Sequence, residues 1–566
     1  MMKPSSSAQL EPGDGVFRNP ILPGGFPDPS ICRVGEEYFL VNSSFEYFPG
    51  LPIHRSRDLV TWELVGYGLQ REEQCRGAVN LQDVQTRGGI HAPTLRFHAG
   101  LFYIITTNVY QPPDPQQPTR LVNFIISARD VAGPWSDPVV VEGAPGIDPD
   151  LFFDEDGKSW YVGTRQPEEP DYPGQGEIWL QELDLSTGRL LGQRYSLWKG
   201  ACGGAWVEGP HLYKRNGFYY LLVAEGGTGY NHAVMVAASE KISGPYLSNP
   251  RNPILTSRHL SYGHWVHSTG HGDLVELPDG RWYMVLLGVR ADEQGRSNMG
   301  RETHLVAVEW ELEPFEPGCA RLEWPVCAPN SGRVERFNPK PFPGGREGEG
   351  AAMLHPYGIA APRSMVFEDH FISESLNLEW NFRRVPGAGV FSLVERPGYL
   401  RLYAGREVFA ERGSCHFMGF RQRESYFDYQ ARMEFLPGSD DLEAGLVLLQ
   451  QDDNYLQFFV CCQAGSVFLK LRLASASGDI VQLAQIALAE YTGNICLRVV
   501  SQDHRYRYEY SLADGQAGFT FFSETGAHLI VSYGYTGAYL GLYATSVGKQ
   551  VAAHADFSQV RCLNFV

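Results

Sequence analysis

Five residues with acid–base side chains recur along the first half of the chain, each at the start of a similar stretch of sequence. They are Asp28, His91, Asp148, Glu208 and His271. Cleavage of a glycosidic bond needs one carboxylic acid that protonates the leaving oxygen, and one carboxylate that acts on the anomeric carbon directly or through water. A third carboxylate nearby would raise the pKa of the acid by charge repulsion and would orient it.

The stretches that begin with these residues resemble one another. They read DPSICRVGEEYFLV, HAPTLRFHAGLFYII, DPDLFFDEDGKSWYV, EGPHLYKRNGFYYLLV and HGDLVELPDGRWYMV. Each contains a short Pro or Gly element, an apolar strand, a turn with Gly and a second, aromatic-rich strand, which is typical of a β-hairpin. The copies begin about 60 residues apart, which leaves room for two more strands in each.

Four strands repeated radially make one blade of a β-propeller, so five copies predict a five-bladed propeller. The first strand of each blade lines the central channel, and the five polar residues should therefore meet at one mouth. The alternative is a β-sandwich whose hairpins are similar by accident.

The polar residues also have ordinary structural explanations. Carboxyls beside Pro and Gly commonly cap turns, but three capping carboxyls in one channel would repel one another without compensation. For His91 the alternatives are a hydrogen-bonded channel residue and a sugar contact. For His271 they are a ligand of a central cation and an active-site hydrogen-bonding group.

The bulk properties predict an all-β globular protein with two domains. The 566 residues are 43% hydrophobic and 20% charged, and the formal net charge of -18 without a Lys/Arg-rich stretch argues against nucleic acid as a partner. Ten cysteines without CxxC pairs indicate free thiols in a reducing compartment. Residues 1–15 lack the apolar segment of a secretion signal, and no run of about 18 apolar residues predicts a membrane span. We therefore expect a cytoplasmic protein that acts on imported sugars.

The second half of the chain follows a different pattern. Residues 331–363 are rich in Pro, Gly and charge, which predicts a linker between a propeller domain at 16–330 and a second domain at 364–566. In that second domain, alternating runs such as YLRLY, SVFLKLRLA and YLQFFV predict antiparallel strands in a β-sandwich.

Several segments strongly resemble glycoside hydrolase family 43, in particular its β-xylosidases. They include FPDPS, GIDPDLFFDEDGK, WVEGPHLYKRNG, STGHGDLVE and MGRETHL in the first domain, and FEDHF, LNLEWNFRRVP and YTGAYLGLYATS in the second. The resemblance covers nearly the whole chain. It implies a five-bladed β-propeller followed by a concanavalin-like β-sandwich, and hydrolysis with inversion at the anomeric carbon.

The same resemblance assigns roles to the three carboxyls. Asp28 would be the general base that activates water, Glu208 the general acid, and Asp148 the carboxylate that tunes and orients the acid. An inverting site needs the base and acid carboxyls about 6.5–9.5 Å apart, so that water fits between base and sugar.

Substrate-binding positions are implied in the same way. Phe45 would form an aromatic wall of the terminal sugar subsite, Arg301 would bind sugar hydroxyls, and Thr228 would add a smaller polar contact. His91 stands in GGIHAP where close relatives commonly have Trp, a departure that favours arabinofuranosyl side chains. No cofactor is expected to be required, although some relatives bind calcium with a histidine at the position of His271.

The expected function is an exo-acting β-xylosidase that releases terminal D-xylose from β-1,4-xylo-oligosaccharides. The alternatives are an α-L-arabinofuranosidase or bifunctional enzyme acting on arabinose-substituted oligosaccharides, and a carbohydrate-binding propeller. A non-catalytic propeller would be expected to have lost one of Asp28, Asp148 and Glu208. All three are present, which argues against the carbohydrate-binding alternative. The invertase and fructosidase group fits less well, because its NDPN opening differs from FPDPS. The resemblance also suggests a homo-oligomer.

Overall fold

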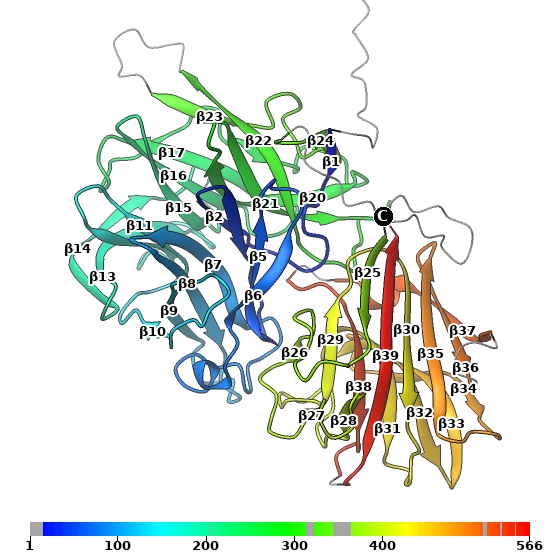
Figure 1. Ribbon diagram of the computed structural model, residues 1–566. Helices are drawn as coiled ribbons and strands as arrows, with labels where there is room; N and C mark the ends of the chain where they lie inside the picture. The colour runs from blue at the N-terminus through cyan, green and yellow to red at the C-terminus, as the bar shows by residue number, and fades with distance from the viewer. Residues whose placement is uncertain are drawn as a thin grey trace, which may run out of the picture.

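The computed structural model describes residues 15–203, 205–312, 322–342, 364–512, 518–532, 535–549 and 551–565. Within these ranges the regular structure is β-strand except for two short 3-10 helices, η1 (Glu72–Cys75) and η2 (Ala527–Ile530). The all-β prediction is confirmed. Figure 1 shows two bodies, an N-terminal one drawn blue to green and a C-terminal one drawn green at β25 and otherwise yellow to red. No helix of the described residues is long and apolar enough to cross a membrane.

The described part of the N-terminal body contains five antiparallel sheets of four or five strands, each built from strands that lie close together in the chain. The first sheet contains β2 (Ser30–Val34), β3 (Glu37–Val41), β5 (Gly50–Ser56) and β6 (Glu63–Leu69). The second contains β7 (Gly89–His98), β8 (Leu101–Tyr110), β9 (Arg120–Ala128) and β10 (Val139–Val140). The third contains β11 (Ile147–Phe153), β12 (Ser159–Arg165), β13 (Glu177–Asp184) and β14 (Arg189–Trp198).

The two remaining sheets of this body follow the same plan. The fourth contains β15 (Glu208–Arg215), β16 (Phe218–Glu225), β17 (Ala233–Ser239), β18 (Leu247–Ser248) and the additional β19 (Leu255–Thr256). The fifth contains β20 (Val266–Glu276), β21 (Trp282–Arg290), β22 (Glu302–Leu312) and β23 (Glu323–Cys327). The first two strands of every sheet are the hairpins predicted from the repeats.

The five sheets are arranged in a closed cycle. Strand β2 contacts β7, β7 contacts β11, β11 contacts β15, β15 contacts β20, and β20 returns to β2. Neighbouring sheets share apolar cores; between the fifth and first sheets, Val285 packs in one cluster with Leu40. A hollow at one end of the cycle is lined by all five first strands, through residues such as Ile31, Phe97, Leu151, Leu212 and Leu274. The first strands therefore surround a common axis.

The C-terminal body is a β-sandwich of two antiparallel sheets. One contains β25 (Ser364–Asp369), β27 (Phe391–Ser392), β28 (Leu400–Tyr403), β30 (Tyr426–Glu434), β35 (Asn494–Gln502), β36 (Arg505–Ser511), β37 (Thr520–Gly526) and β39 (His554–Phe565). The other contains β29 (Phe417–Arg421), β31 (Glu443–Gln451), β32 (Asn454–Gln463), β33 (Ser466–Ala474), β34 (Ile480–Ala487) and β38 (Tyr539–Thr545). The sheets face each other across rings such as Phe458 and Tyr508, whose centroids lie 5.4 Å apart.

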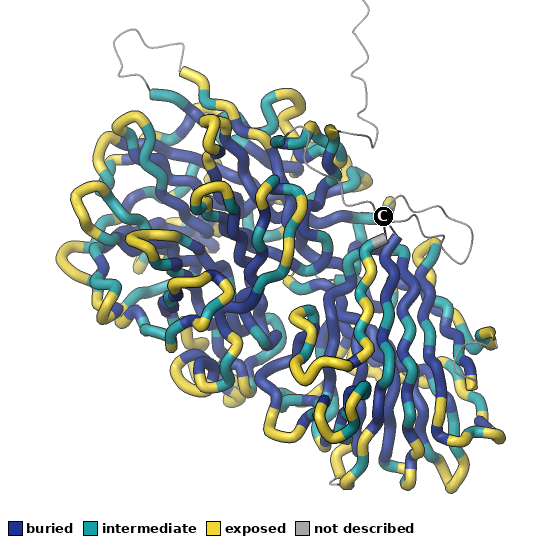
Figure 2. The backbone as a smooth tube through the Cα atoms, in the orientation of Figure 1, coloured by how far each residue is buried: buried dark blue, intermediate teal, exposed yellow. Residues whose placement is uncertain are grey.

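The two bodies are joined by backbone pairing and buried charge. Strand β4 (Tyr47–Phe48) of the first body pairs with β26 (Phe382–Arg383) of the second. Arg290 donates to Glu424 across the junction at 2.6 Å, and both side chains are buried. Figure 2 shows that most of the backbone inside each body is buried, with the exposed segments mainly in loops. The sandwich can therefore supply residues to a site on the first body.

The predicted linker at 331–363 is described only in its first part. There, β24 (Phe337–Pro339) pairs with β1 (Val16–Arg18) and so connects the region after the fifth sheet to the start of the chain. Residues 343–363 lie outside the described residues. The domain boundaries inferred from composition stay predictions.

Candidate active site

A left-handed backbone bend recurs at the first strand of all five sheets. At each bend, one residue with positive φ is followed directly by Pro or Gly. The bend residues are Asp28 (φ 50°), Ala92 (φ 40°), Asp148 (φ 54°), Gly209 (φ 57°) and His271 (φ 49°). In the second to fifth sheets the bend coincides with a shift in strand register. These five residues therefore occupy equivalent places around the axis.

This bend corrects the alignment made from the sequence. His91 and Glu208 were aligned with the three bend residues, but each lies one position before its bend. The reason is that the repeat is defined by backbone shape and not by side-chain polarity. Gly209 is required there because a Cβ atom would come within 2.8 Å of His271 Cε1, and because positive φ costs about 1–2 kcal/mol for other residues.

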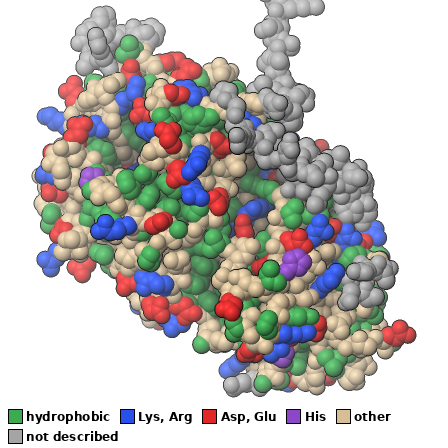
Figure 3. Space-filling view, viewed as in Figure 1, with side chains coloured by type: hydrophobic (Ala, Val, Ile, Leu, Met, Phe, Trp, Pro, Cys, Tyr) green, Lys and Arg blue, Asp and Glu red, His purple; other side chains and the backbone are tan. Residues whose placement is uncertain are grey.

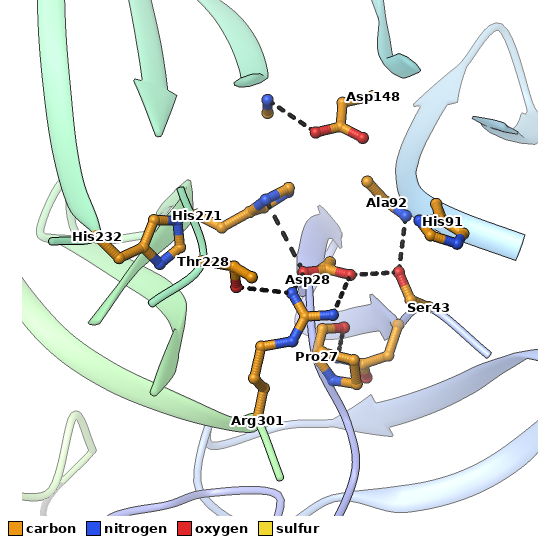
Figure 4. Close-up of polar contacts among 12 residues, drawn as sticks. Pro27, Asp28, Ser43, His91, Ala92, Asp148, Thr228, His232, His271 and Arg301 are labelled. Atoms are coloured by element: carbon orange, nitrogen blue, oxygen red, sulfur yellow. Dashed lines mark hydrogen bonds and ion pairs between the residues drawn. The ribbon is translucent and has the colours of Figure 1, made fainter. Parts of the chain in front are cut away.

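Asp28 is the centre of the polar network drawn in Figure 4. Its Oδ2 accepts a hydrogen bond from Ser43 Oγ at 2.6 Å, and its Oδ1 accepts one from Arg301 Nη1 at 2.7 Å. Burial alone would raise the pKa of Asp28, but the charge of Arg301 and the other donors outweigh it and lower the pKa below its usual range. Asp28 is therefore a buried carboxylate that stays ionised.

Asp148 is connected directly to the peptide that follows the candidate acid. Its Oδ2 accepts a hydrogen bond from the backbone N–H of Gly209 at 3.1 Å. Asp148 is 7% exposed, whereas Glu208 is only partly buried. Asp148 thus fixes the backbone beside Glu208, and Glu208 keeps part of its surface accessible.

The pKa values of the two carboxyls are both raised. Burial raises the pKa of Glu208 to about 7, with a further contribution from the negative charge of Asp28. Burial raises the pKa of Asp148 well above its usual value, and repulsion from Glu208 and Asp28 adds to the effect. We expected Asp148 to raise the pKa of Glu208, whereas the charge that acts on Glu208 is that of Asp28. The site therefore pairs a carboxylate that stays ionised with two carboxyls that keep their protons to higher pH than usual.

Arg301 is held between aromatic rings and polar partners. Its guanidinium carbon lies 5.5 Å from the centroid of Phe45 and 5.4 Å from that of Tyr535. Its Nη1 also donates to Thr228 Oγ1 at 3.1 Å. Phe45 is only 2% exposed and its ring contacts that of His91. It therefore supports the side chains of Arg301 and His91 and presents little surface of its own.

The histidines of the site are neutral near pH 7. Burial lowers the pKa of both His91 and His271 to about 4. His91 Nε2 lies 3.0 Å from the carbonyl oxygen of Arg87 and therefore carries the proton. His271 Nδ1 lies 3.9 Å from Asp28 Oδ1. The site thus brings together all eight residues selected from the sequence, Asp28, Phe45, His91, Asp148, Glu208, Thr228, His271 and Arg301.

A second ring of polar groups lies further along the axis, two residues after each bend. It consists of Ser30, Thr94, Asp150, His211 and Asp273. Arg96 connects three of these residues, with contacts of 2.9 Å to Asp150, 3.1 Å to Asp273 and 3.1 Å to His211 Nδ1. The axis therefore contains its own cation, paired with two buried carboxyl groups.

The residues around His271 do not fit a calcium ion. Calcium takes six to eight oxygen ligands, whereas the charged oxygen nearest to His271 belongs to Asp28, which is already paired with Arg301. Among the described residues, no group of three or more His, Cys, Asp or Glu side chains is arranged to hold a metal ion. The expectation of calcium on His271 stays a prediction that this donor set does not support.

Three residues of the site were missed in the sequence. Ser43 donates to Asp28 and accepts from the N–H of Ala92, so it connects the first two sheets. Tyr535 comes from the sandwich, and its carbonyl oxygen accepts from Arg301 at 3.4 Å. Of these three, Arg96 offered a usable signal, because it is a charged residue between the apolar Leu95 and Phe97.

Comparison with known proteins identifies the family. Residues 17–313 match the sequence profile of glycosyl hydrolases family 43, and residues 368–562 match that of the β-xylosidase C-terminal concanavalin A-like domain. A xylosidase/arabinosidase of Butyrivibrio fibrisolvens is 37% identical over 96% of this chain and 98% of its own length. A non-reducing end α-L-arabinofuranosidase of Bacteroides ovatus is 34% identical over 97% of this chain and 95% of its own.

Solved structures agree with this result. The crystal structure of xylan β-1,4-xylosidase from Bacillus halodurans has a TM-score of 0.83 to this chain, with 30% identity, and the match covers 96% of this chain and 99% of the other. Together with the carboxyl site, the two matched profiles show that the chain belongs to family 43 of the glycosyl hydrolases.

Proposed function

We propose that the protein is an inverting, exo-acting β-xylosidase that releases terminal D-xylose from β-1,4-xylo-oligosaccharides. The observation that carries the proposal is the contrast between Asp28, which stays ionised on Arg301, and Glu208, whose pKa is raised to about 7 in the same site. The names of relatives that are xylosidases and β-xylosidases support the choice of sugar.

The reaction follows from these protonation states. Asp28 takes a proton from a water molecule whose oxygen attacks the anomeric carbon. Glu208 gives its proton to the glycosidic oxygen as the bond from carbon to that oxygen breaks. The anomeric centre is inverted, and solvent then returns the proton from Asp28 to Glu208. Asp148 is a positioning residue, because it holds the peptide that follows Glu208.

We also propose that the first body is a five-bladed β-propeller and that the five sheets are its blades. The closed cycle of first strands and the five equivalent bends support this assignment. We assign the propeller to residues 16–330 and the sandwich, of concanavalin-like type, to residues 364–566. Tyr535 of the sandwich closes one side of the site, which favours a pocket that accepts the end of a chain.

An α-L-arabinofuranosidase or bifunctional activity is the second candidate. One observation favours it, the similarity to the Bacteroides ovatus arabinofuranosidase, and so does the resemblance, which leads us to expect Trp where this chain has His91. The substrates would then be arabinose-substituted oligosaccharides. We further propose that the protein acts in the cytoplasm, as a homo-oligomer and without a cofactor, so activity should persist in EDTA.

The proposal is tested by comparing kcat/KM for 4-nitrophenyl β-D-xylopyranoside and 4-nitrophenyl α-L-arabinofuranoside. We expect the xyloside to be preferred, and proton NMR to show α-xylose as the first product from xylobiose. A preference for the arabinoside would establish the second candidate instead. Absence of turnover of both, and of xylobiose, would contradict a catalytic function.

A further inference from the structure

Trp206 is an exposed indole two residues before the candidate acid Glu208. The residue is 54% exposed and has a φ of 54°, whereas the next residue, Val207, is buried. Exposure of a large apolar side chain and left-handed backbone at a bulky residue are both unfavourable for folding. Strained residues of this kind persist where the surrounding structure imposes them, and they cluster at ligand sites.

The surrounding backbone holds the indole in place. The N–H of Trp206 donates to the carbonyl oxygen of Gly174 at 2.6 Å, and the N–H of Gly226 donates to that of Ala205 at 2.8 Å. The ring lies against two glycines, since a Cβ atom at Gly174 would be 2.9 Å from Cε2 and one at Gly227 would be 3.4 Å from Cδ1. The indole is therefore fixed against backbone, and more than half of the residue surface remains open.

The position of Trp206 is adjacent to the candidate catalytic site. The Cα atoms of Trp206 and Glu208 are two residues apart, so they lie at most about 7 Å from each other. On the other side, Gly227 is followed by Thr228, which accepts a hydrogen bond from Arg301. The indole thus lies at the rim of the site, beside the carboxyl that must reach the leaving oxygen.

We propose that Trp206 is the platform on which the leaving-group sugar stacks, with a β-linked pyranose ring as its ligand. The inference rests on the proposed function, because it places this ring on the side of the scissile bond that Glu208 protonates. A rigid indole offers a large flat apolar surface at low entropic cost, which suits the C–H face of a pyranose. The platform would make the enzyme prefer oligosaccharides over glycosides with small leaving groups.

The test compares two substrates that share the same xylose and the same need for protonation. Xylobiose has a pyranose leaving group, whereas methyl β-D-xylopyranoside has only a methoxy group. We expect Trp206→Ala to lower kcat/KM for xylobiose about tenfold and to leave kcat/KM for the methyl xyloside unchanged. Trp206→Tyr should retain most of the preference for xylobiose. Phe521→Ala, which removes an exposed ring from β37 of the sandwich, is the matched control and should change neither value.

Three other results would overturn the inference that Trp206 binds the leaving-group sugar. An equal loss on both substrates would show that Trp206 acts through Glu208 and not on the leaving sugar. No loss on either would show that the ring binds nothing, and a changed oligomeric state in size-exclusion chromatography would show that it covers a subunit interface. Wild-type protein that hydrolyses neither substrate would contradict the proposed function itself, which separates that failure from failure of the platform.

Discussion

Arg301 and Asp28 form a buried ion pair, with 2.7 Å between Nη1 and Oδ1 and both residues at most 4% exposed. The primary partner of Arg301 is therefore Asp28, the candidate general base. The resemblance had assigned this arginine to sugar hydroxyls, and that role stays a prediction, since its Nε has no partner among the described residues but is buried. The charge of Arg301 offsets the burial of Asp28 and keeps that carboxylate ready to accept a proton.

The first prediction concerns the pH dependence of kcat/KM. Glu208 must be protonated, and its pKa is about 7, so kcat/KM should fall as pH rises through 7. Asp28 must be ionised, and its pKa is lowered, so the acidic limb should lie below the ordinary aspartate value of about 4. A pH–rate profile with xylobiose measures both limbs. An alkaline limb near pH 5 would disagree with the assignment of Glu208.

Removal of the Arg301 charge should move the acidic limb. In Arg301→Met, burial of Asp28 is no longer offset, so its pKa should rise above its ordinary value and the acidic limb should move to higher pH. The value of kcat/KM should also fall by about 100-fold or more, because the base and the substrate both lose a donor. Thr228→Val, which removes a neutral partner of Arg301, is the control and should leave the limb in place. An unchanged limb in Arg301→Met would show that other groups keep Asp28 ionised.

Arg96 should be essential for stability. Arg96→Met would leave the buried carboxylates of Asp150 and Asp273 without their cation. Breaking a buried ion pair costs about 3–5 kcal/mol, so the free energy of unfolding of the first body should fall by about that amount. Denaturant unfolding followed by fluorescence measures the change. Arg55→Met, which breaks the exposed pair with Glu63, should leave the transition where it is. Equal behaviour of the two variants would mean that the second ring contributes little.

Tyr535 should affect substrate binding from the other domain. Its ring contacts Phe45 and the guanidinium of Arg301, so Tyr535→Ala removes one wall of the site. We expect the KM for xylobiose to rise about tenfold with a smaller change in kcat, and Tyr535→Phe to behave like the wild type. Steady-state kinetics of the two variants check this. If Tyr535→Ala kept the wild-type KM, the sandwich would not form part of the pocket.

The hairpins, Asp28 and Asp148 were predictable because they repeat, and repetition can be read from one sequence, whereas Glu208 lies one position before its bend and was assigned its role through the family resemblance. The exact register was not, since Ala92 and Gly209 occupy bend positions for reasons of backbone shape that side-chain type does not reveal. Tyr535 could not be found because no local pattern connects it to Arg301, which lies more than 200 residues earlier. The pairing of Arg301 with Asp28 depends in the same way on contacts between the first and fifth sheets.

The role of Glu208 as the general acid is tested most directly by the activity of Glu208→Gln on two xylosides. The leaving group of 4-nitrophenyl β-D-xylopyranoside needs little protonation, whereas that of xylobiose needs a proton from the acid. We predict that the variant loses about 100- to 10,000-fold in kcat/KM on xylobiose and far less on the nitrophenyl xyloside, while Asp28→Asn loses activity on both. Equal losses on the two substrates in Glu208→Gln, or none on either, would contradict the role of Glu208 as the acid.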